Sequence, residues 1–224
     1  MPHINIAIDG PAGAGKSTVA KEVARQLGLL YVDTGAMYRG VAWLALNYGV
    51  SPEDEEALVQ LLEKHPLCFE RNGQGGLDIY HNNICINAEL RRPDVSSLVS
   101  QLSVYPKVRA ILTRWQQEFA RNHSVVMDGR DVGTVVLPHA DVKVYLTASL
   151  EERTRRRAEE FQAKGFDVSV DELRRSIEER DHRDSSRSVA PLKPADDAHC
   201  IDSTGKPVQQ VVEEILALVE RICR

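Results

Sequence analysis

Apolar positions recur along the chain with two spacings, one typical of strands and one typical of helices. Short apolar runs between turn residues predict strands at 3–8, 29–32, 124–127, 142–146 and 199–201. Apolar stripes at helical spacing predict helices at 18–27, 36–48, 51–64, 93–104, 106–122, 149–164, 170–184 and 208–222. This alternation favours an α/β fold, a doubly wound parallel sheet flanked by helices, whose ligands bind at the carboxyl ends of the strands.

One segment, between residues 67 and 87, departs from this alternation. Turn-rich stretches of glycine and asparagine divide it into short β-like pieces at 68–69, 77–80 and 84–86. The pattern predicts a small antiparallel β insert on the parallel core. The helix before this insert is expected to have Ser51 as its N-cap and Pro52 in its first position.

The composition narrows the classes of function. The 224 residues are 42% hydrophobic and 27% charged, as in an ordinary soluble protein. A net charge of -5 argues against nucleic acid or a membrane as a general partner. The longest apolar stretch, 40–46, is too short to span a bilayer. The N-terminus has no basic region followed by a long apolar run, so a leader peptide is not expected. We expect a cytoplasmic monomer.

The cysteines are expected to be reduced thiols. They are widely separated and form no C-x-x-C pair, so neither a disulfide nor a zinc site is indicated. They are Cys68, Cys85, Cys200 and Cys223.

A glycine-rich stretch follows the first strand and fits the pattern G-x-x-x-x-G-K-[ST]. Between a strand and a helix, such a loop directs backbone N–H groups and the helix dipole toward an anion. We expect Lys16 to reach the β- and γ-phosphates of a nucleoside triphosphate and the Ser17 hydroxyl to bind Mg²⁺. The predicted nucleotide-binding loop consists of Gly10, Pro11, Ala12, Gly13, Ala14, Gly15, Lys16, Ser17 and Thr18.

Two further predicted strands end in polar clusters, which should lie at the same edge of the sheet. The first cluster contains Asp33, and the second contains Asp131. Tyr38 and Arg39 follow the first cluster and lie off the apolar stripe of their helix, which leaves them free to contact a ligand. The alternative is a structural role, in which the aspartates only cap helices.

Two later helices carry charged residues at helical spacing, i, i+3 and i+4 in the first and i, i+3, i+4 and i+7 in the second, so that each group shares one helical face. Guanidinium groups suit phosphate oxygens, although glutamates nearby also allow a salt-bridged, solvent-exposed surface. His182 has no metal-ligand partner at a useful spacing, so we expect it to be exposed. The two groups are Arg153, Arg156 and Arg157, and Arg180, Arg183, Asp184 and Arg187.

Four stretches together resemble bacterial cytidylate kinases, nearly end to end. They are 8–18, 33–39, 128–134 and 179–187. The resemblance implies a P-loop NTPase fold and a single nucleoside-monophosphate-kinase domain over 1–224, with 63–104 as the insert that binds the monophosphate and 149–195 as a short lid. It also implies transfer of the γ-phosphoryl group of ATP to CMP or dCMP, giving ADP and CDP or dCDP, with Mg²⁺ as cofactor.

The same resemblance implies roles for individual residues. Lys16, Asp33, Arg39, Arg130 and Arg187 match catalytic positions, of which the last four lie near the acceptor phosphate. Asp33 is the best candidate for a supporting carboxylate, and we assign no obligatory general base. The implied substrate-binding residues are Thr34, Tyr38, Arg39, Ser100, Arg109, Arg130, Asp131, Arg180, Asp184 and Arg187, among which Ser100, Arg109 and Asp131 read cytosine and Asp184 binds the ribose. The lid arginines are not distinguished by the resemblance, and we assign ATP binding to Arg157.

Several alternatives remain open. Adenylate, uridylate or shikimate kinases share the fold and differ in the acceptor. A non-catalytic ATP-binding switch would bind nucleotide without turnover, which the set of acceptor arginines disfavours. A nucleic-acid-binding ATPase is disfavoured by the acidic balance of the chain.

Overall fold

A computed structural model describes residues 3–163, 165 and 168–223 of the chain. Its central sheet has five parallel strands in the order β2-β6-β1-β7-β8, which confirms the predicted doubly wound α/β fold. The strands are β1 (Asn5–Asp9), β2 (Leu30–Asp33), β6 (Val125–Gly129), β7 (Val142–Thr147) and β8 (His199–Asp202).

Both faces of this sheet are covered by helices, so side chains along the central strands alternate between two buried clusters. On β1, Ile6 and Ile8 enter one cluster, whereas Ala7 enters the other. Helices α1 (Lys16–Leu27) and α8 (Val208–Ile222) cover the first face; α2 (Thr34–Tyr48) and α5 (Pro106–Asn122) cover the second. Burial on both faces explains the continuous apolar runs 6–8 of β1 and 125–127 of β6.

The predicted antiparallel insert is present as a three-stranded sheet, β3-β4-β5. Asn82 and Asn83 both have positive φ angles, 49° and 62°, in the two-residue turn before β5, a conformation that asparagine tolerates well. The backbone carbonyl of Gly75, in the turn after β3, accepts a hydrogen bond from the Tyr31 N–H of β2 at 2.8 Å. The strands are β3 (Cys68–Arg71), β4 (Leu77–His81) and β5 (Ile84–Cys85); α3 (Glu55–Lys64) precedes them and α4 (Pro93–Leu102) follows.

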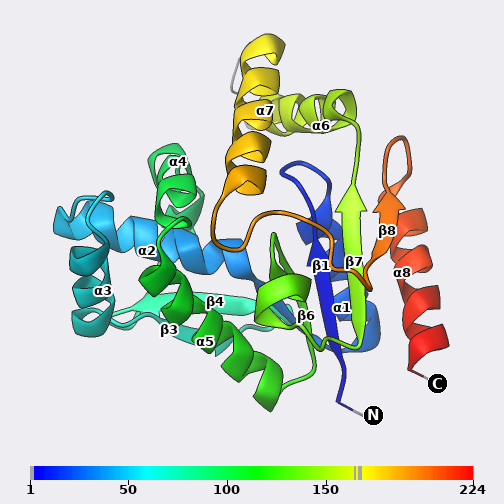
Figure 1. The fold of residues 1–224 in the computed structure, drawn as a ribbon, viewed down its shortest axis with the longest axis horizontal. Helices are drawn as coiled ribbons and strands as arrows, with labels where there is room; N and C mark the ends of the chain where they lie inside the picture. Colours follow the sequence, from blue (N-terminus) through cyan, green and yellow to red (C-terminus); the bar gives the residue numbers. More distant parts are fainter. Residues whose placement is uncertain (1–2, 164, 166–167, 224) are drawn as a thin grey trace.

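Two helices, α6 (Leu150–Ala163) and α7 (Val170–Ser186), lie beyond the carboxyl ends of the strands (Figure 1). The chain leaves β7 directly into α6, and α7 then returns toward α4 (Figure 1). The loops that follow the parallel strands therefore lie on the same side of the sheet as these two helices (Figure 1).

Local details differ from the sequence prediction, among them a short 3₁₀-helix, η1 (Glu89–Arg91), where no element was predicted. Helix α3 begins at Glu55, because the Asp54 carboxylate, rather than Ser51, caps it by accepting the Ala57 N–H at 3.0 Å. The Ser51 hydroxyl instead accepts the Glu53 N–H within the preceding turn. A short π-helix, η2 (Val132–Val136), follows β6 where no element was predicted.

The described part of the chain contains no helix that combines the length and apolar character needed to cross a bilayer. The thiols of Cys68, Cys85, Cys200 and Cys223 are free and exposed.

Candidate active site

The polar clusters predicted at three strand ends lie side by side. The parallel register pairs Asp128 of β6 with Asp33 of β2 on one side and with Ile8 of β1 on the other. The adjoining cavity, of about 1700 Å³, is lined by the glycine-rich loop, by 33–39 and 128–131, and by side chains of α4, α6 and α7. The convergence expected from the strand pattern is therefore confirmed.

The glycine-rich loop runs from the end of β1 to the first turn of α1. Gly10 has φ 149°, and a Cβ there would lie 1.9 Å from the carbonyl oxygen of Leu146, so only glycine fits this crossing of β7. Gly15 is the N-cap of α1 and provides no side-chain cap. Its helix therefore presents N–H groups that a bound phosphate can satisfy.

Replacing Gly10 with alanine is expected to displace the loop, lowering the free energy of unfolding by about 1–3 kcal/mol and weakening ATP binding. Gly28→Ala is the matched control, because Gly28 also has positive φ, 68°, but nothing lies within 4 Å of a Cβ built there. This control should lose stability without losing ATP affinity. Thermal unfolding and ATP titration measure the two effects; equal loss of affinity in both variants would contradict the steric argument.

Lys16 lies within the loop with 6% of its surface exposed, and its Nζ donates to the carbonyl oxygen of Pro11 at 2.7 Å. Burial, together with the guanidinium of Arg130, lowers the pKa of the Lys16 ammonium below its ordinary value. A phosphate beside Nζ would favour the charged form. The residue is therefore placed to respond to an anion in the cavity.

Asp128 is a functional candidate that the sequence analysis did not single out. Its Oδ2 accepts a hydrogen bond from the Ser17 hydroxyl at 2.8 Å, and its Oδ1 accepts one from the Tyr31 hydroxyl at 2.7 Å. Burial and the nearby Asp33 raise the pKa of its carboxyl. A carboxylate at the end of an apolar strand beside the strand of the loop was the available signal.

A hydroxyl and a carboxylate, both hard oxygen ligands, suit a magnesium ion that is also bound by phosphates. Ser17 and Asp128 provide this pair. No group of three or more His, Cys, Asp or Glu side chains suited to a metal occurs among the described residues. The Ser17 hydroxyl and the Asp128 carboxylate therefore fit a divalent ion.

Three arginines opposite the loop each pair with a carboxylate. Arg39 Nη2 lies 2.7 Å from Asp33, Arg130 Nε lies 2.8 Å from Asp184, and Arg109 Nη2 lies 2.5 Å from Asp131. Asp33 also caps α2, because its Oδ1 accepts the Ala36 N–H at 2.9 Å. This carboxylate therefore has the structural role of a helix cap in addition to its ion pair with Arg39.

Several guanidinium groups around this space have buried nitrogen atoms with no hydrogen-bond partner among the residues that the structure describes. They are Arg39 Nε, Arg180 Nε and Arg187 Nη2. Burial, with Arg130 nearby, lowers the pKa of Arg180 to about 10, and burial also lowers the pKa of Arg187. Unsatisfied buried donors on cations are costly, and an oxyanion would satisfy them.

The arginine face predicted on α7 is only partly directed to the cavity. Arg180, Asp184 and Arg187 line it, whereas Arg183 is exposed and contacts the Glu179 carbonyl of its own helix. Helix α7 ends at Ser186, so Arg187 leaves the helical face and turns inward as its C-cap. His182 is exposed, as expected.

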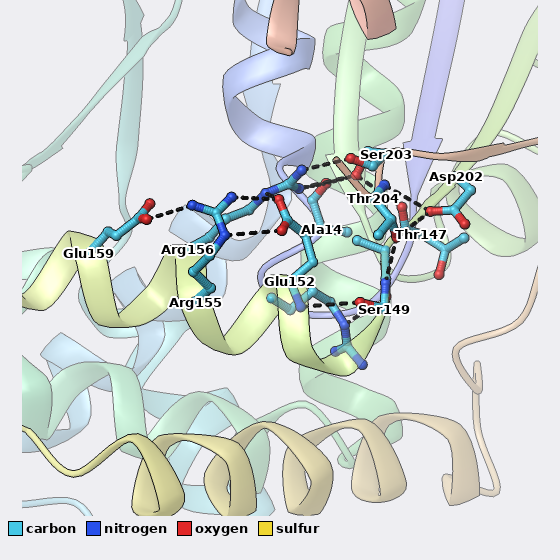
Figure 2. A network of polar contacts seen from close by, with 12 residues as sticks. Ala14, Thr147, Ser149, Glu152, Arg155, Arg156, Glu159, Asp202, Ser203 and Thr204 are labelled. Carbon is cyan, nitrogen blue, oxygen red and sulfur yellow. Dashed lines mark hydrogen bonds and ion pairs between the residues drawn. The ribbon is translucent and has the colours of Figure 1, made fainter. Parts of the chain in front are cut away.

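The arginines of α6 have different environments. Arg153 is buried, where it contacts Asp181 at 2.5 Å and the Ala12 carbonyl at 3.1 Å. Arg156 joins α6 to the loop after β8 through the carbonyl of Ser203, at 2.7 Å, and to the Ala14 carbonyl, at 3.4 Å (Figure 2). Arg153 and Arg156 thus connect α6 to the glycine-rich loop through hydrogen bonds to two of its carbonyl groups.

Arg157, the residue assigned to ATP, lines the cavity. Its guanidinium pairs with Glu160 at 2.7 Å and lies 4.9 Å from the centre of the Phe161 ring. Its contact with ATP stays a prediction.

The residues expected to read a base lie together at the α4–α5 side of the cavity. Arg109 is buried, donates to the Ser103 carbonyl as well as to Asp131, and lies 5.7 Å from the centre of the Tyr38 ring. Ser100 lines the same space. Tyr38, expected to be free of the core, is 8% exposed and packs in it while also facing the cavity. Thr34 donates its hydroxyl to the carbonyl of Asp128 at 2.8 Å.

Comparisons with known proteins agree with this arrangement. The sequence profile of the family described as cytidylate kinase matches residues 6–221. The cytidylate kinases of Streptococcus pneumoniae strains 70585 and Hungary19A-6 are 46% and 45% identical to this chain over 221 residues, covering 99% of it and 99% of each relative. A crystal structure of an uncharacterized protein from Eubacterium ventriosum ATCC 27560 has a similar fold, with a TM-score of 0.55 at 14% identity over 98% of this chain and 99% of that one. This chain belongs to the cytidylate kinase family, and it is a kinase with the P-loop NTPase fold.

Proposed function

We propose that this kinase transfers the γ-phosphoryl group of ATP to CMP or dCMP, with Mg²⁺ as cofactor. The observation that carries the proposal is one cavity with a phosphate-binding loop on one side and arginines with unpartnered N–H groups on the other. Family membership supports cytidine monophosphates as the acceptors.

Phosphoryl transfer requires two anions to be held in line and their charge neutralised. On the donor side, the N–H groups of the loop and the Lys16 ammonium would bind the ATP phosphates. Ser17 and Asp128 would hold Mg²⁺, which supplies positive charge between the phosphates when bound. Arg157 is the proposed lid contact to ATP.

On the acceptor side, Arg39, Arg130 and Arg187 would bind the phosphate of the monophosphate. The first two pair with Asp33 and Asp184. These contacts orient the guanidinium groups toward the place where the acceptor phosphate would bind. Asp33 is the proposed supporting carboxylate, and Asp184 with Arg180 would contact the ribose.

The segments around the cavity suggest how water is kept out. We assign 63–104 to binding of the monophosphate and 149–195 to a lid within one domain, because α4, α6 and α7 contribute to the cavity wall. Closure of the lid would exclude water and favour transfer to the monophosphate over hydrolysis. ATP hydrolysis without CMP is therefore expected to be slow.

Selection of cytosine is assigned to Asp131, Arg109 and Ser100. A carboxylate can accept from the cytosine N4 amino group, whereas uracil presents an oxygen there. The Arg109 guanidinium and the Ser100 hydroxyl can donate to N3 and O2. A site built from such groups rejects the wrong base, because its buried polar atoms are then left unpaired.

Asp131→Asn is expected to lower the ratio of kcat/KM for CMP to kcat/KM for UMP by a factor that corresponds to roughly 1–3 kcal/mol. The measurement is kcat/KM for both substrates in the wild type and the variant. Asp197→Asn, a change in an exposed carboxylate that pairs with Lys143, is the control and should leave the preference unchanged. A constant ratio in Asp131→Asn would mean that this carboxylate does not read the base.

The direct test of the proposed function is a panel of acceptors with Mg·ATP, in which ADP release is measured for CMP, dCMP, UMP, AMP and shikimate. CMP and dCMP should give the highest kcat/KM. Preference for another acceptor would overturn the proposed substrate. Tight ATP binding without turnover of any acceptor would instead favour the non-catalytic switch. ATP hydrolysis without an acceptor that is as fast as phosphorylation of CMP would favour an ATPase.

A further inference from the structure

Asp9 is a buried carboxylate to which the proposed reaction gives no role. It is the last residue of β1, directly before the glycine-rich loop, and 4% of its surface is exposed. Its Oδ1 accepts the Val132 N–H at 2.8 Å and its Oδ2 accepts the Gly133 N–H at 2.7 Å. Burial raises the pKa of this carboxyl to about 6, while the two N–H groups act in the opposite direction. The strand of the donor loop is thus bonded to a turn more than one hundred residues away.

The turn that Asp9 holds carries both acceptor-side groups that follow β6. Arg130 pairs with Asp184 of α7, and Asp131 pairs with Arg109 of α5. These contacts place two side chains from consecutive positions against different helices. The backbone conformation of this turn therefore determines where the two groups lie.

The N–H groups held by Asp9 are those at the start of η2, whose N-cap is Asp131. An aspartate at an N-cap ordinarily accepts the N–H of the second or third helical residue with its own side chain, and the second residue here is Gly133. Asp131 makes no side-chain cap bond. Because Asp9 satisfies the N–H groups from another strand, the Asp131 carboxylate is available to Arg109 and to a ligand.

Close packing leaves this turn little freedom. A Cβ on Gly133 would lie 3.4 Å from Asp9 Oδ2 and 3.3 Å from Lys143 Cδ. A Cβ on Gly129 would lie 2.7 Å from Val132 Cγ2. The turn therefore packs directly against the Asp9 carboxylate.

We propose that Asp9 is a positioning residue for acceptor selection: it caps the turn 130–133 from β1 and so releases Asp131 to read the base. This inference rests on the proposed function, in which Asp131 contacts cytosine. Asp9 itself touches neither nucleotide in this scheme, and its effect passes through the backbone of the turn.

The test is Asp9→Asn, which keeps the size of the side chain but replaces one acceptor oxygen with an NH₂ group that would face an N–H. We expect KM for CMP to rise by about 10-fold or more, as for a small displacement of a binding group, with KM for ATP changed less than about twofold. The ratio of kcat/KM for CMP over UMP should fall. Asp54→Ala, which removes the N-cap of α3 away from the cavity, controls for a general loss of stability.

A double-mutant cycle tests whether Asp9 acts through Asp131. In an Asp131→Asn background, Asp9→Asn should have no further effect on the ratio of CMP to UMP. An additive effect would overturn the proposed route. Equal changes in KM for ATP and for CMP, or no change in either, would overturn the positioning role and leave Asp9 with a structural one.

Gly133→Val provides a second test if Asp9→Asn does not fold. A Cβ there already lies 3.4 Å from Asp9 Oδ2 and 3.3 Å from Lys143 Cδ, so the two further methyl groups of valine should displace the turn from the Asp9 carboxylate without changing any charge. The same selective rise in KM for CMP is expected, and a normal KM for CMP in folded Gly133→Val would overturn the proposal. Failure of the wild type to phosphorylate CMP would overturn the proposed function itself, and that measurement precedes any comparison of variants.

Discussion

Replacing Lys16 with methionine is expected to lower turnover of CMP by roughly 10²–10³-fold, the usual effect of removing one electrostatic contact to the transferred group. Methionine fills a similar volume without the charge. Burial lowers the pKa of the Lys16 ammonium, which means that the buried site disfavours its charge. Removing this charge should therefore not destabilise the fold. The expected result is a protein that folds normally and turns over slowly.

Thermal unfolding and steady-state turnover measure the two parts of this expectation. Lys64→Met, in the last turn of α3, removes an exposed lysine and is the control for loss of positive charge. It should leave turnover unchanged. Near-normal turnover in folded Lys16→Met would show that the glycine-rich loop does not hold the transferred phosphate.

Arg130→Ala is expected to lower kcat/KM for CMP by about 10² or more, while ATP affinity changes little. Arg130 is proposed to bind the acceptor phosphate, and it also pairs with the buried Asp184. Burial acts to raise the pKa of Asp184, but Arg130 and its neighbours hold it below the ordinary value. Removing the guanidinium should therefore raise that pKa and destabilise the site in its ionised form.

The pH dependence of Arg130→Ala has a defined sign. A carboxyl with a depressed pKa stabilises the folded state at neutral pH, and this contribution is lost as pH falls into the acid range. The stability difference between wild type and variant should thus be largest near neutrality and shrink in acid. ATP titration, CMP kinetics and thermal unfolding at several pH values measure these effects.

Arg183→Ala is the matched control for Arg130→Ala. Arg183 is an exposed arginine on the helix that carries Asp184, and it contacts only a carbonyl of its own helix among the bonds described. Its removal should leave CMP kinetics unchanged. A loss of ATP affinity as large as the loss of CMP efficiency in Arg130→Ala would place Arg130 on the donor side.

Local patterns in the sequence were sufficient to predict the sheet and the glycine-rich loop. Strands with continuous apolar residues and helices with apolar stripes depend on neighbours within a few positions, as does the constrained turn at Gly10. The convergence of Asp33 with the residues after β6 also followed, since parallel strands share the edge at which their carboxyl ends lie.

The missed residues depend on pairings between distant parts of the chain. Asp9 and Asp128 acquire their roles from the register of β1 against β6, across more than one hundred residues. No local spacing encodes which backbone N–H groups lie opposite a carboxylate. The arginines of α7 are a different case. Helical periodicity placed Arg183 and Arg187 on one face with Arg180, but Arg183 is exposed, and α7 ends at Ser186, so that Arg187 turns inward as its C-cap.

Capping showed how close local alternatives can be. Ser51 and Asp54 are both good N-caps, separated by three residues. The ionised carboxylate also interacts favourably with the helix dipole, so α3 begins after Asp54. A boundary error of this size leaves the buried face of α3 unchanged.

The bond between Gly75 and Tyr31 has a consequence for the behaviour of the chain outside catalysis. β2 is an edge strand of the central sheet, and an open edge can pair with a strand of another molecule and begin aggregation. The tip of the insert occupies the Tyr31 N–H on that edge. Shortening the turn at 72–76 would uncover it, so variants engineered in this hairpin risk poor solubility even where every residue around the cavity is kept.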